Sequence, residues 1–222
     1  MKKEVKILLG VGLLVIAGGL IGANYYRKSV QSVPVAATVN EALVRPDSPS
    51  LGPADAKVTV VEFLDPECET CASFSPVVKS LMKEFDGKVR FVVRYAAFHK
   101  NAKPAAIHTE AAGEQGKYWE MQEKLFAKQG EWGEVHGAAH QPSAVTPPAV
   151  SFEKYAQELG LNMDQFKASV SDPKHAAKVD RDMKDLQTMG VKSTPTFFVN
   201  GRKLARLNQQ DLRALINEEL KK

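Results

Sequence analysis

Glu62-Phe63-Leu64-Asp65-Pro66-Glu67-Cys68-Glu69-Thr70-Cys71 is the stretch that decides the fold. The apolar run from Val58 to Leu64 predicts a β-strand that ends shortly before the two cysteines. An amphipathic helix is predicted to follow, because apolar residues recur at helical spacing between Phe74 and Phe85. The two cysteines of this Cys-x-x-Cys motif therefore lie at a strand-to-helix junction, in the first turn of the helix.

This position gives the first cysteine a distinct chemistry. The N–H groups of a helix's first turn have no intrahelical partner, and the positive end of the helix dipole lies there. The pKa of Cys68 is therefore expected to fall below the free value of about 8.5. Cys71 lies three residues further on and on the same side of the helix, so it can close a disulfide with Cys68. A thiol of low pKa beside a resolving thiol predicts thiol–disulfide exchange.

Other uses of the cysteine pair are weaker. A structural zinc site takes four ligands, and Cys68 and Cys71 are the only cysteines of the 222 residues. A purely structural disulfide would close a very short loop and stabilise the fold little. His136 and His140 have a spacing that binds metal on a helix, but Gly and Pro residues surround them. We predict no metal site.

A second informative stretch lies near the C-terminus. Residues 190–201 read Gly-Val-Lys-Ser-Thr-Pro-Thr-Phe-Phe-Val-Asn-Gly. Pro195 stands before an aromatic and β-branched run that predicts a strand. The pair Asn200-Gly201 predicts a hairpin turn that leads to another strand at Arg202.

The order of strand, Cys-x-x-Cys, helix and distant Thr-Pro hairpin resembles the thioredoxin fold. It is most similar to the DsbA-like extracytoplasmic thiol–disulfide oxidoreductases, which carry an inserted helical domain. The resemblance covers residues from about 50 to 222. It implies that the Thr194–Pro195 bond is cis and packs against the cysteines, with Thr194 offering backbone groups to a substrate peptide. The alternative is a trans proline that opens an edge strand.

Glu62 is a carboxylate inside the otherwise apolar first strand, and burial raises the pKa of such a group. In the resembled family, a Glu six residues before the first cysteine lies beneath the disulfide, and Glu62 has this spacing to Cys68. The implied role is to accept the proton of Cys71 when that thiol attacks a mixed disulfide. The alternative places Glu62 at a sheet edge, in solvent.

Acidic residues surround the first cysteine, and we expect Asp65, Glu67 and Glu69 to form an exposed acidic rim. Glu69 and Thr70 stand between the cysteines, where strong oxidants of the resembled family have a His or a similar donor. The like charge of Glu69 disfavours ionisation of a neighbouring thiol. We therefore predict a pKa of Cys68 well above the roughly 3.5 of DsbA, and a weaker oxidant.

The net charge of +4 belongs to residues 1–28, and the remaining chain has equal numbers of acidic and basic residues. Nucleic-acid binding is therefore not predicted. Ile7 to Tyr26 is a run of 20 uncharged residues, long enough to span a bilayer as a helix. Its positive N-terminal flank predicts a cytoplasmic N-terminus and an exported remainder. A cleaved signal peptide is the alternative.

The predicted organisation has three parts: an anchor or signal segment at 1–28, a flexible tether at 29–56, and a thioredoxin-like α/β domain at 57–222. A helical subdomain is expected as an insertion at about 100–172. The sheet is expected to be mixed, with the first strands parallel through a crossover and the C-terminal hairpin antiparallel.

The predicted function is thiol–disulfide exchange with cysteine-containing exported proteins. Cys68 forms the mixed disulfide and Cys71 resolves it, with no cofactor. A redox partner in the membrane or periplasm is implied, because each turnover leaves the pair in the opposite redox state. We expect a protein of the bacterial inner membrane with its catalytic domain in the periplasm. The direction of electron flow stays open, and a copper-binding or copper-delivery protein is the alternative.

Overall fold

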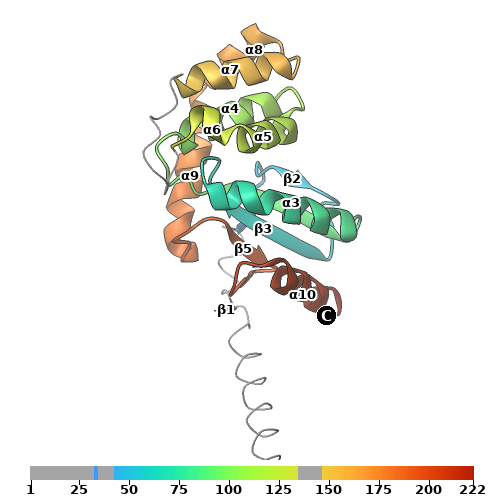
Figure 1. The fold of residues 1–222 in the computed structure, drawn as a ribbon. Coiled ribbons are helices and arrows are strands. Elements are labelled where there is room, and N and C mark those ends of the chain that lie inside the picture. Colours follow the sequence, from blue (N-terminus) through green and yellow to red (C-terminus); the bar gives the residue numbers. More distant parts are fainter. Residues whose placement is uncertain (1–32, 35–42, 135–146) are drawn as a thin grey trace, which may run out of the picture.

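The computed structural model describes residues 33–34, 43–134 and 147–222 (Figure 1). The six strands of its sheet are β1 Val33–Pro34, β2 Ser50–Leu51, β3 Val58–Leu64, β4 Val89–Tyr95, β5 Thr196–Val199 and β6 Arg202–Lys203. The helices are α3 Glu69–Glu84, α4 Ala102–Gly113, α5 Tyr118–Ala127, α6 Gln129–Trp132, α7 Pro148–Glu158, α8 Met163–Val170, α9 Pro173–Met189 and α10 Gln209–Leu220.

The strands form one mixed sheet in the order β1-β6-β5-β3-β4-β2. β3 and β4 are parallel and connected through α3, whereas β5 is antiparallel to both β3 and β6. The β5–β6 turn has left-handed φ angles at Asn200 (46°) and Gly201 (82°), which suit an Asn-Gly hairpin. The predicted mixed sheet and hairpin are confirmed.

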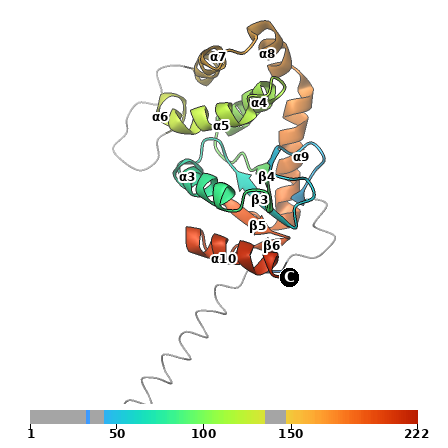
Figure 2. The same ribbon diagram turned by 90° about the vertical axis from the view of Figure 1, so that its right-hand side faces the viewer.

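Helices cover both faces of the sheet. Figure 2 shows α3 and α10 on one face and α9 on the other. Because side chains alternate along a strand, Val60 of β3 packs with the α3 and α10 side, and Val61 packs with the α9 side. β3 is thus buried on both faces, and this fixes the position of the loop that follows it.

The helices α4 to α8 lie beyond one end of the sheet (Figure 1) and have a core of their own. Large buried side chains in this core include Met121, Trp132, Phe152 and Phe166. The long helix α9 begins beside these helices and ends beside the sheet. Asp172 caps its start by accepting a hydrogen bond from the backbone N–H of Lys174.

The structure of residues 43–56 contradicts the predicted flexible tether, which was placed at 29–56. Leu43 is 2% exposed and packs in the core on the α9 side, and β2 pairs with β4. Arg45 forms an ion pair of 2.9 Å with Asp185 of α9. Pro46, Pro49 and Pro53 disfavour a helix over this stretch but allow an extended segment to lie along the edge of the sheet. These residues therefore belong to the folded domain.

The predicted anchor lies outside the described residues. Within the described ranges, no helix has the length and apolar character needed to cross a bilayer. The boundaries proposed for the helical insertion also stay a prediction.

Candidate active site

The two cysteines occupy the start of α3. Cys68 is the N-cap residue, and its backbone N–H donates to the carbonyl oxygen of Asp65 at 3.1 Å. Cys68 is 7% exposed and Cys71 is fully buried, and both are free thiols in this structure. The burial follows from the fold, because the parallel strand β3 delivers the chain to the end of the sheet between its two helical layers.

The two thiols differ strongly in acidity. A hydrogen bond from Cys71 lowers the pKa of Cys68 to about 5, against the effect of burial, and Thr194 and the backbone of Cys71 and Thr70 contribute further hydrogen bonds. Burial raises the pKa of Cys71 far above its usual range, and its hydrogen bond to Cys68 and the charge of Glu62 add to this effect. At neutral pH, Cys68 is therefore a thiolate and Cys71 stays protonated. The pKa of Cys68 lies above the roughly 3.5 of DsbA, in the predicted direction.

The Thr194–Pro195 peptide, from near the far end of the chain, lies beside Cys68. The Thr194–Pro195 bond is cis, as the family resemblance implied, and Pro195 is buried. In the thiol form, Sγ of Cys68 donates to the carbonyl oxygen of Thr194 at 3.5 Å. The structure thus joins the two stretches on which the sequence analysis depended, across 126 positions of sequence. The alternative of a trans proline is wrong.

Glu62 lies in β3, between β4 and β5, and is 5% exposed. The alternative of an exposed edge position is therefore wrong. Burial raises the pKa of Glu62 to about 8, and the charge of Cys68 adds to this effect. In return, the charge of Glu62 raises the pKa of Cys71. The structure thus brings together all five predicted site residues: Glu62, Cys68, Cys71, Thr194 and Pro195.

The predicted acidic rim is wrong for two of its three residues. Asp65 is fully buried and Glu67 is 1% exposed, whereas Glu69 is exposed. Oδ1 of Asp65 accepts the backbone N–H of Glu67 at 2.8 Å. Oδ2 accepts the backbone N–H groups of Phe98 and His99 and lies 2.8 Å from Nδ1 of His99. Asp65 is buried because it satisfies donors from two loops.

Glu67 connects the same loop to the helical layer. Its carboxylate accepts the backbone N–H of Asn101 at 2.6 Å, the side-chain amide of Asn101 at 2.8 Å and the backbone N–H of Glu134 at 2.9 Å. Gln129 of α6 donates to the carbonyl oxygens of Pro66 at 2.9 Å and of Cys68 at 3.2 Å. Sequence reasoning missed these contacts. The available signal was that Glu67 follows a largely apolar, mostly buried strand, where loops from neighbouring elements converge.

The described residues contain no cluster of three or more His, Cys, Asp or Glu side chains that could hold a metal ion. His108 is buried against the ring of Phe152, with centroids 4.9 Å apart, and has a packing role. His136 and His140 lie outside the described residues. The copper-binding alternative therefore has no supporting observation in the part of the chain that the structure describes.

Comparison with known proteins shows similarity over most of the chain. A family model described as thioredoxin matches residues 45–218. The crystal structure of a thioredoxin-like oxidoreductase from Silicibacter pomeroyi DSS-3 is 26% identical, with a TM-score of 0.66, over 82% of this chain and 98% of that one. Oxidised BdbD from Bacillus subtilis has the same identity and TM-score, over 87% of this chain and 99% of that one. For alpha-DsbA1 from Wolbachia pipientis the TM-score is 0.69 at 18% identity, over 82% and 96% of the two chains, a likeness of fold alone.

Curated relatives with similar sequences are much longer proteins. Na(+)/H(+) antiporter NhaA 1 from Salinispora arenicola is 37% identical over 155 residues, which are 68% of this chain and 21% of that protein. Na(+)/H(+) antiporter NhaA from Herminiimonas arsenicoxydans is 34% identical over 153 residues, 69% of this chain and 22% of that protein. The chain thus spans about a fifth of the length of these relatives, and the similarity is confined to that share.

Proposed function

This chain belongs to the thioredoxin family, and from that premise we propose that it is a DsbA-like thiol–disulfide oxidoreductase with Cys68 and Cys71 as its redox-active pair. The proposed substrates are cysteine-containing proteins outside the cytoplasm. One observation carries the proposal: a thiolate of lowered pKa at the N-terminus of α3 lies beside Thr194 and Pro195, above a buried thiol that stays protonated. Thiol–disulfide exchange requires this difference between attacking and resolving thiols.

In the reducing direction, the Cys68 thiolate attacks one sulfur of a substrate disulfide, and the other sulfur leaves as a thiolate. A mixed disulfide now joins Cys68 to the substrate. In this mixed disulfide Cys68 carries no charge, so it no longer raises the pKa of Glu62. The ionised form of Glu62 takes the proton of Cys71, which attacks Sγ of Cys68, so the Cys68–Cys71 disulfide forms and the second substrate sulfur leaves as a thiolate. In the oxidising direction the same steps run in reverse. A substrate thiolate attacks Cys68, and the departing Cys71 takes its proton from Glu62.

The contacts of the cis peptide support a substrate site for Thr194 and Pro195. Thr194 is half-buried and its carbonyl oxygen faces Cys68, so a substrate chain that reaches Sγ must pass beside this backbone. An extended peptide can pair with exposed backbone groups of this kind. Each turnover leaves the cysteine pair in the opposite redox state, so a redox partner in the membrane or periplasm must restore it.

We place the catalytic domain outside the cytoplasm of a bacterium, held at the inner membrane by the uncharged run from Ile7 to Tyr26. The support for this placement is the length of the run and the lysines that precede it. Fractionation of cells that produce the full chain tests it. The protein is expected in the membrane fraction. Added protease is expected to cleave its C-terminal domain only after the outer membrane has been permeabilised.

The test of the redox role compares Cys71→Ser with Cys68→Ser, using insulin as the disulfide substrate. Cys71→Ser is expected to accumulate an insulin adduct that dithiothreitol removes, because the resolving thiol is missing. Cys68→Ser is expected to form no adduct and to have no insulin-reducing turnover, whereas the unaltered protein turns over equally with and without a chelator. Equal adduct formation by the two variants, or loss of turnover with the chelator, contradicts the proposal.

A further inference from the structure

The loop between α9 and β5 carries the cis peptide, and it also carries an exposed lysine. Gly190 ends α9 with a left-handed φ of 62°, and the backbone N–H of Val191 donates to the carbonyl oxygen of Leu186 at 3.0 Å. Val191 is 5% exposed, so its side chain anchors the loop directly before Lys192. Lys192 itself is exposed. The fold thus holds a basic residue at a fixed place, two positions before Thr194.

A second lysine lies beside this loop. Nζ of Lys203 on β6 donates to the carbonyl oxygen of Gly190 at 2.7 Å, where a cation suits the negative end of the α9 dipole. Burial lowers the pKa of Lys203, and the neighbouring charge of Lys192 adds to this effect. Lys203 therefore helps to hold the loop, and its charge adds to that of Lys192. In the part of the chain that the structure describes, no ion pair joins either lysine to a carboxylate.

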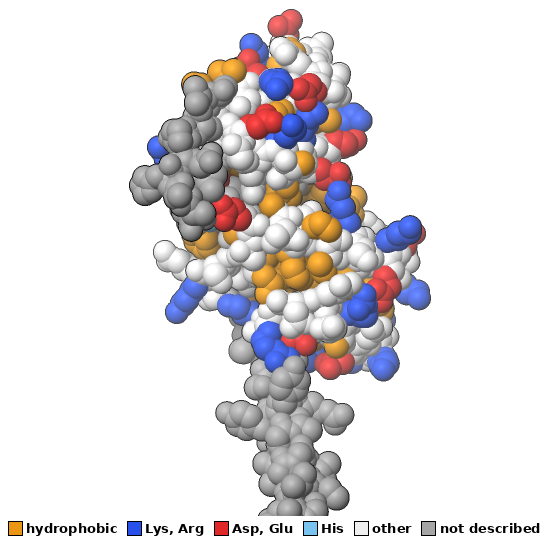
Figure 3. Space-filling model, in the orientation of Figure 1, with side chains coloured by type: hydrophobic (Ala, Val, Ile, Leu, Met, Phe, Trp, Pro, Cys, Tyr) orange, Lys and Arg blue, Asp and Glu red, His pale blue; other side chains and the backbone are white. Residues whose placement is uncertain are grey.

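Other lysines near the start of α3 have acidic partners. Nζ of Lys79 on α3 lies 2.7 Å from Oε1 of Glu123, and Nζ of Lys100 lies 3.7 Å from Oε1 of Glu134. Figure 3 shows Lys and Arg side chains projecting near the end of α9. Since like charges repel, Lys192 gains nothing from its basic neighbour, and a negative group placed beside the two would be attracted.

The burial of two acidic residues leaves the surface around Cys68 basic. The carboxylates of Asp65 and Glu67 are buried and accept backbone N–H groups. His99 is compensated by Asp65, 2.8 Å from its Nδ1. The acidic side chain that stays exposed next to Cys68 is that of Glu69. Two unpaired lysines therefore face one exposed carboxylate on this surface.

A substrate chain that reaches Sγ of Cys68 passes beside Thr194, as in the proposed function on which this inference rests. An extended chain advances about 3.3 Å per residue, and the Cα atoms of Lys192 and Thr194 are at most about 7 Å apart. A side chain two residues from the substrate cysteine therefore comes within reach of the ammonium group of Lys192. We propose that Lys192 is a specificity-determining residue, and that the preferred substrates carry Asp or Glu two residues from the reacting cysteine.

The attraction acts on the first step of the exchange. The attacking group is a thiolate, so it repels a substrate that is itself negatively charged. The positive charges of Lys192 and Lys203 offset this repulsion beside the path of the substrate. Complementary charge of this kind mainly raises the rate of association and favours one class of partner over another.

The test measures how fast Cys68 attacks three disulfide-linked peptide dimers. The full chain carries Cys71→Ser, so that the adduct persists. The peptides are identical except for Glu, Gln or Lys at the positions two residues before and after their single cysteine. The Cys68 thiolate bonds to one peptide sulfur, the disulfide of the dimer breaks, and the second peptide leaves as a thiolate. Each rate is divided by the rate of the same dimer with dithiothreitol, which removes the reactivity of the peptide itself.

The Glu peptide is expected to react on the order of tenfold faster than the Lys peptide in about 0.01 M salt, where the Debye length is about 30 Å. The ratio should approach one in about 1 M salt, where the Debye length is about 3 Å. Lys192→Glu should reverse the preference at low salt. Because the readout is a ratio between peptides, any change in the reactivity of Cys68 cancels.

Lys88→Glu is the matched control. It makes the same change of net charge at an exposed lysine beyond the far end of α3, about 24 Å from Cys68 along the helix. Equal normalised rates for the Glu and Lys peptides, or a preference that Lys88→Glu shifts as much as Lys192→Glu, overturns the inference. If the proposed redox function itself fails, no peptide forms an adduct with Cys68, so the two failures are distinct.

Discussion

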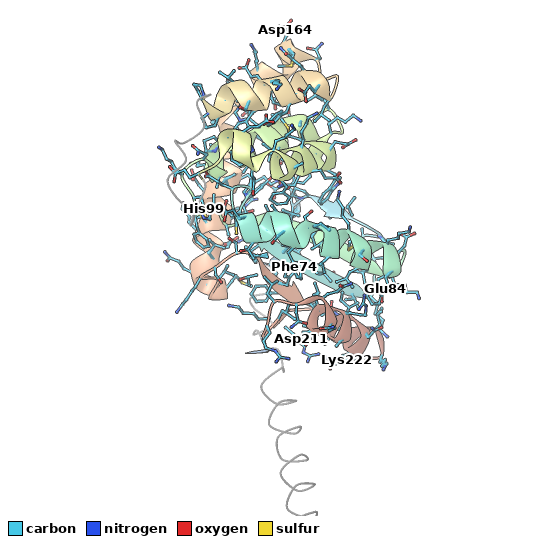
Figure 4. All side chains as sticks on the ribbon, in the orientation of Figure 1. Phe74, Glu84, His99, Asp164, Asp211 and Lys222 are labelled. Carbon is cyan, nitrogen blue, oxygen red and sulfur yellow. The ribbon has the colours of Figure 1, made fainter. Side chains whose placement is uncertain are left out.

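Oδ2 of Asp65 and Nδ1 of His99 lie 2.8 Å apart, although 34 positions separate the two residues in the sequence. Figure 4 shows His99 beside the beginning of α3, where Cys68 lies. Burial lowers the pKa of His99, but the bond to Asp65 and the charges of Asp65 and Cys68 outweigh this and raise it. A loop distant in sequence thus supplies a positive charge near a cysteine motif that lacks its own histidine.

We expect His99→Gln to raise the pKa of Cys68, because the variant removes the imidazolium near the thiolate. One charge at this kind of partly exposed site is worth about 1 kcal/mol, or about a fivefold change in the ratio of thiolate to thiol. Titration of the thiolate absorbance of the reduced protein measures the change. His108→Gln is the matched control, since His108 lies on α4 and packs against Phe152 of α7. Identical titration midpoints for His99→Gln and the unaltered protein would contradict this role.

Glu67 and Glu69 offer a second comparison, one residue on each side of Cys68. The carboxylate oxygens of Glu67 accept N–H groups of Asn101 and Glu134. Glu67→Gln replaces one of these oxygens by an NH2 group, which donates and cannot accept, so a donor then faces a donor. The expected loss in the free energy of unfolding is about 1–3 kcal/mol, measured by urea denaturation. Glu69→Gln changes an exposed side chain and is expected to stay within about 0.5 kcal/mol of the unaltered protein. Equal effects of the two substitutions would show that the contacts of Glu67 do not stabilise the fold.

Local signals predicted much of the fold and the centre of the site. The apolar run of β3, the helical spacing in α3 and the turn at Asn200 act within a few residues, so a single sequence reveals them. Cys68 was found from its Cys-x-x-Cys motif, whereas the family resemblance implied the places of Pro195 and Glu62 in the site. The structure places them together, with Glu62 buried and the Pro195 bond cis.

The errors concern residues whose partners are distant in the sequence. Asp65 and Glu67 are charged residue types, which predicts exposure to solvent. Their burial depends on backbone N–H groups that lie more than 30 positions away in the sequence. The segment around Leu43 appears to be a tether because it is rich in Pro and Ser. One apolar side chain and an ion pair from Arg45 to α9 are sufficient to fold it onto the domain. No periodic pattern encodes such contacts.

Arg94 carries a buried charge in β4. It is fully buried, and its guanidinium contacts Asp182 at 2.8 Å, Asp185 at 2.6 Å and the carbonyl oxygen of Leu43 at 3.1 Å. Asp182→Ala removes a partner from a buried cation, which should lower the free energy of unfolding by about 3–5 kcal/mol. Asp180→Ala, on the same helix, breaks only the exposed ion pair with Lys103 and should cost less than about 1 kcal/mol. Urea denaturation of both variants measures the difference, and costs within about 1 kcal/mol of each other would contradict it.

Glu62 links the stability of the reduced protein to pH. Its pKa is raised to about 8 in the folded state, against 4.5 for the free side chain. Below pH 4.5 both states are protonated. Between these values the unfolded chain ionises while the folded protein keeps its proton, so the free energy of unfolding falls as pH rises, by about 1.4 kcal/mol per pH unit.

Glu62→Gln keeps the shape of the side chain and removes this penalty. The variant should therefore be more stable than the unaltered protein by about 3 kcal/mol at pH 7, with a difference that disappears toward pH 4.5. The thiolate of Cys68 contributes a pH dependence of the opposite sign, because its pKa is lowered, but it is present in both proteins and largely cancels in the comparison. Urea denaturation under reducing conditions between pH 4.5 and pH 8 measures the difference. If the difference in the free energy of unfolding between the two proteins is the same at every pH in this range, Glu62 has an ordinary pKa in the folded protein. A carboxyl with an ordinary pKa could not hold the proton of Cys71.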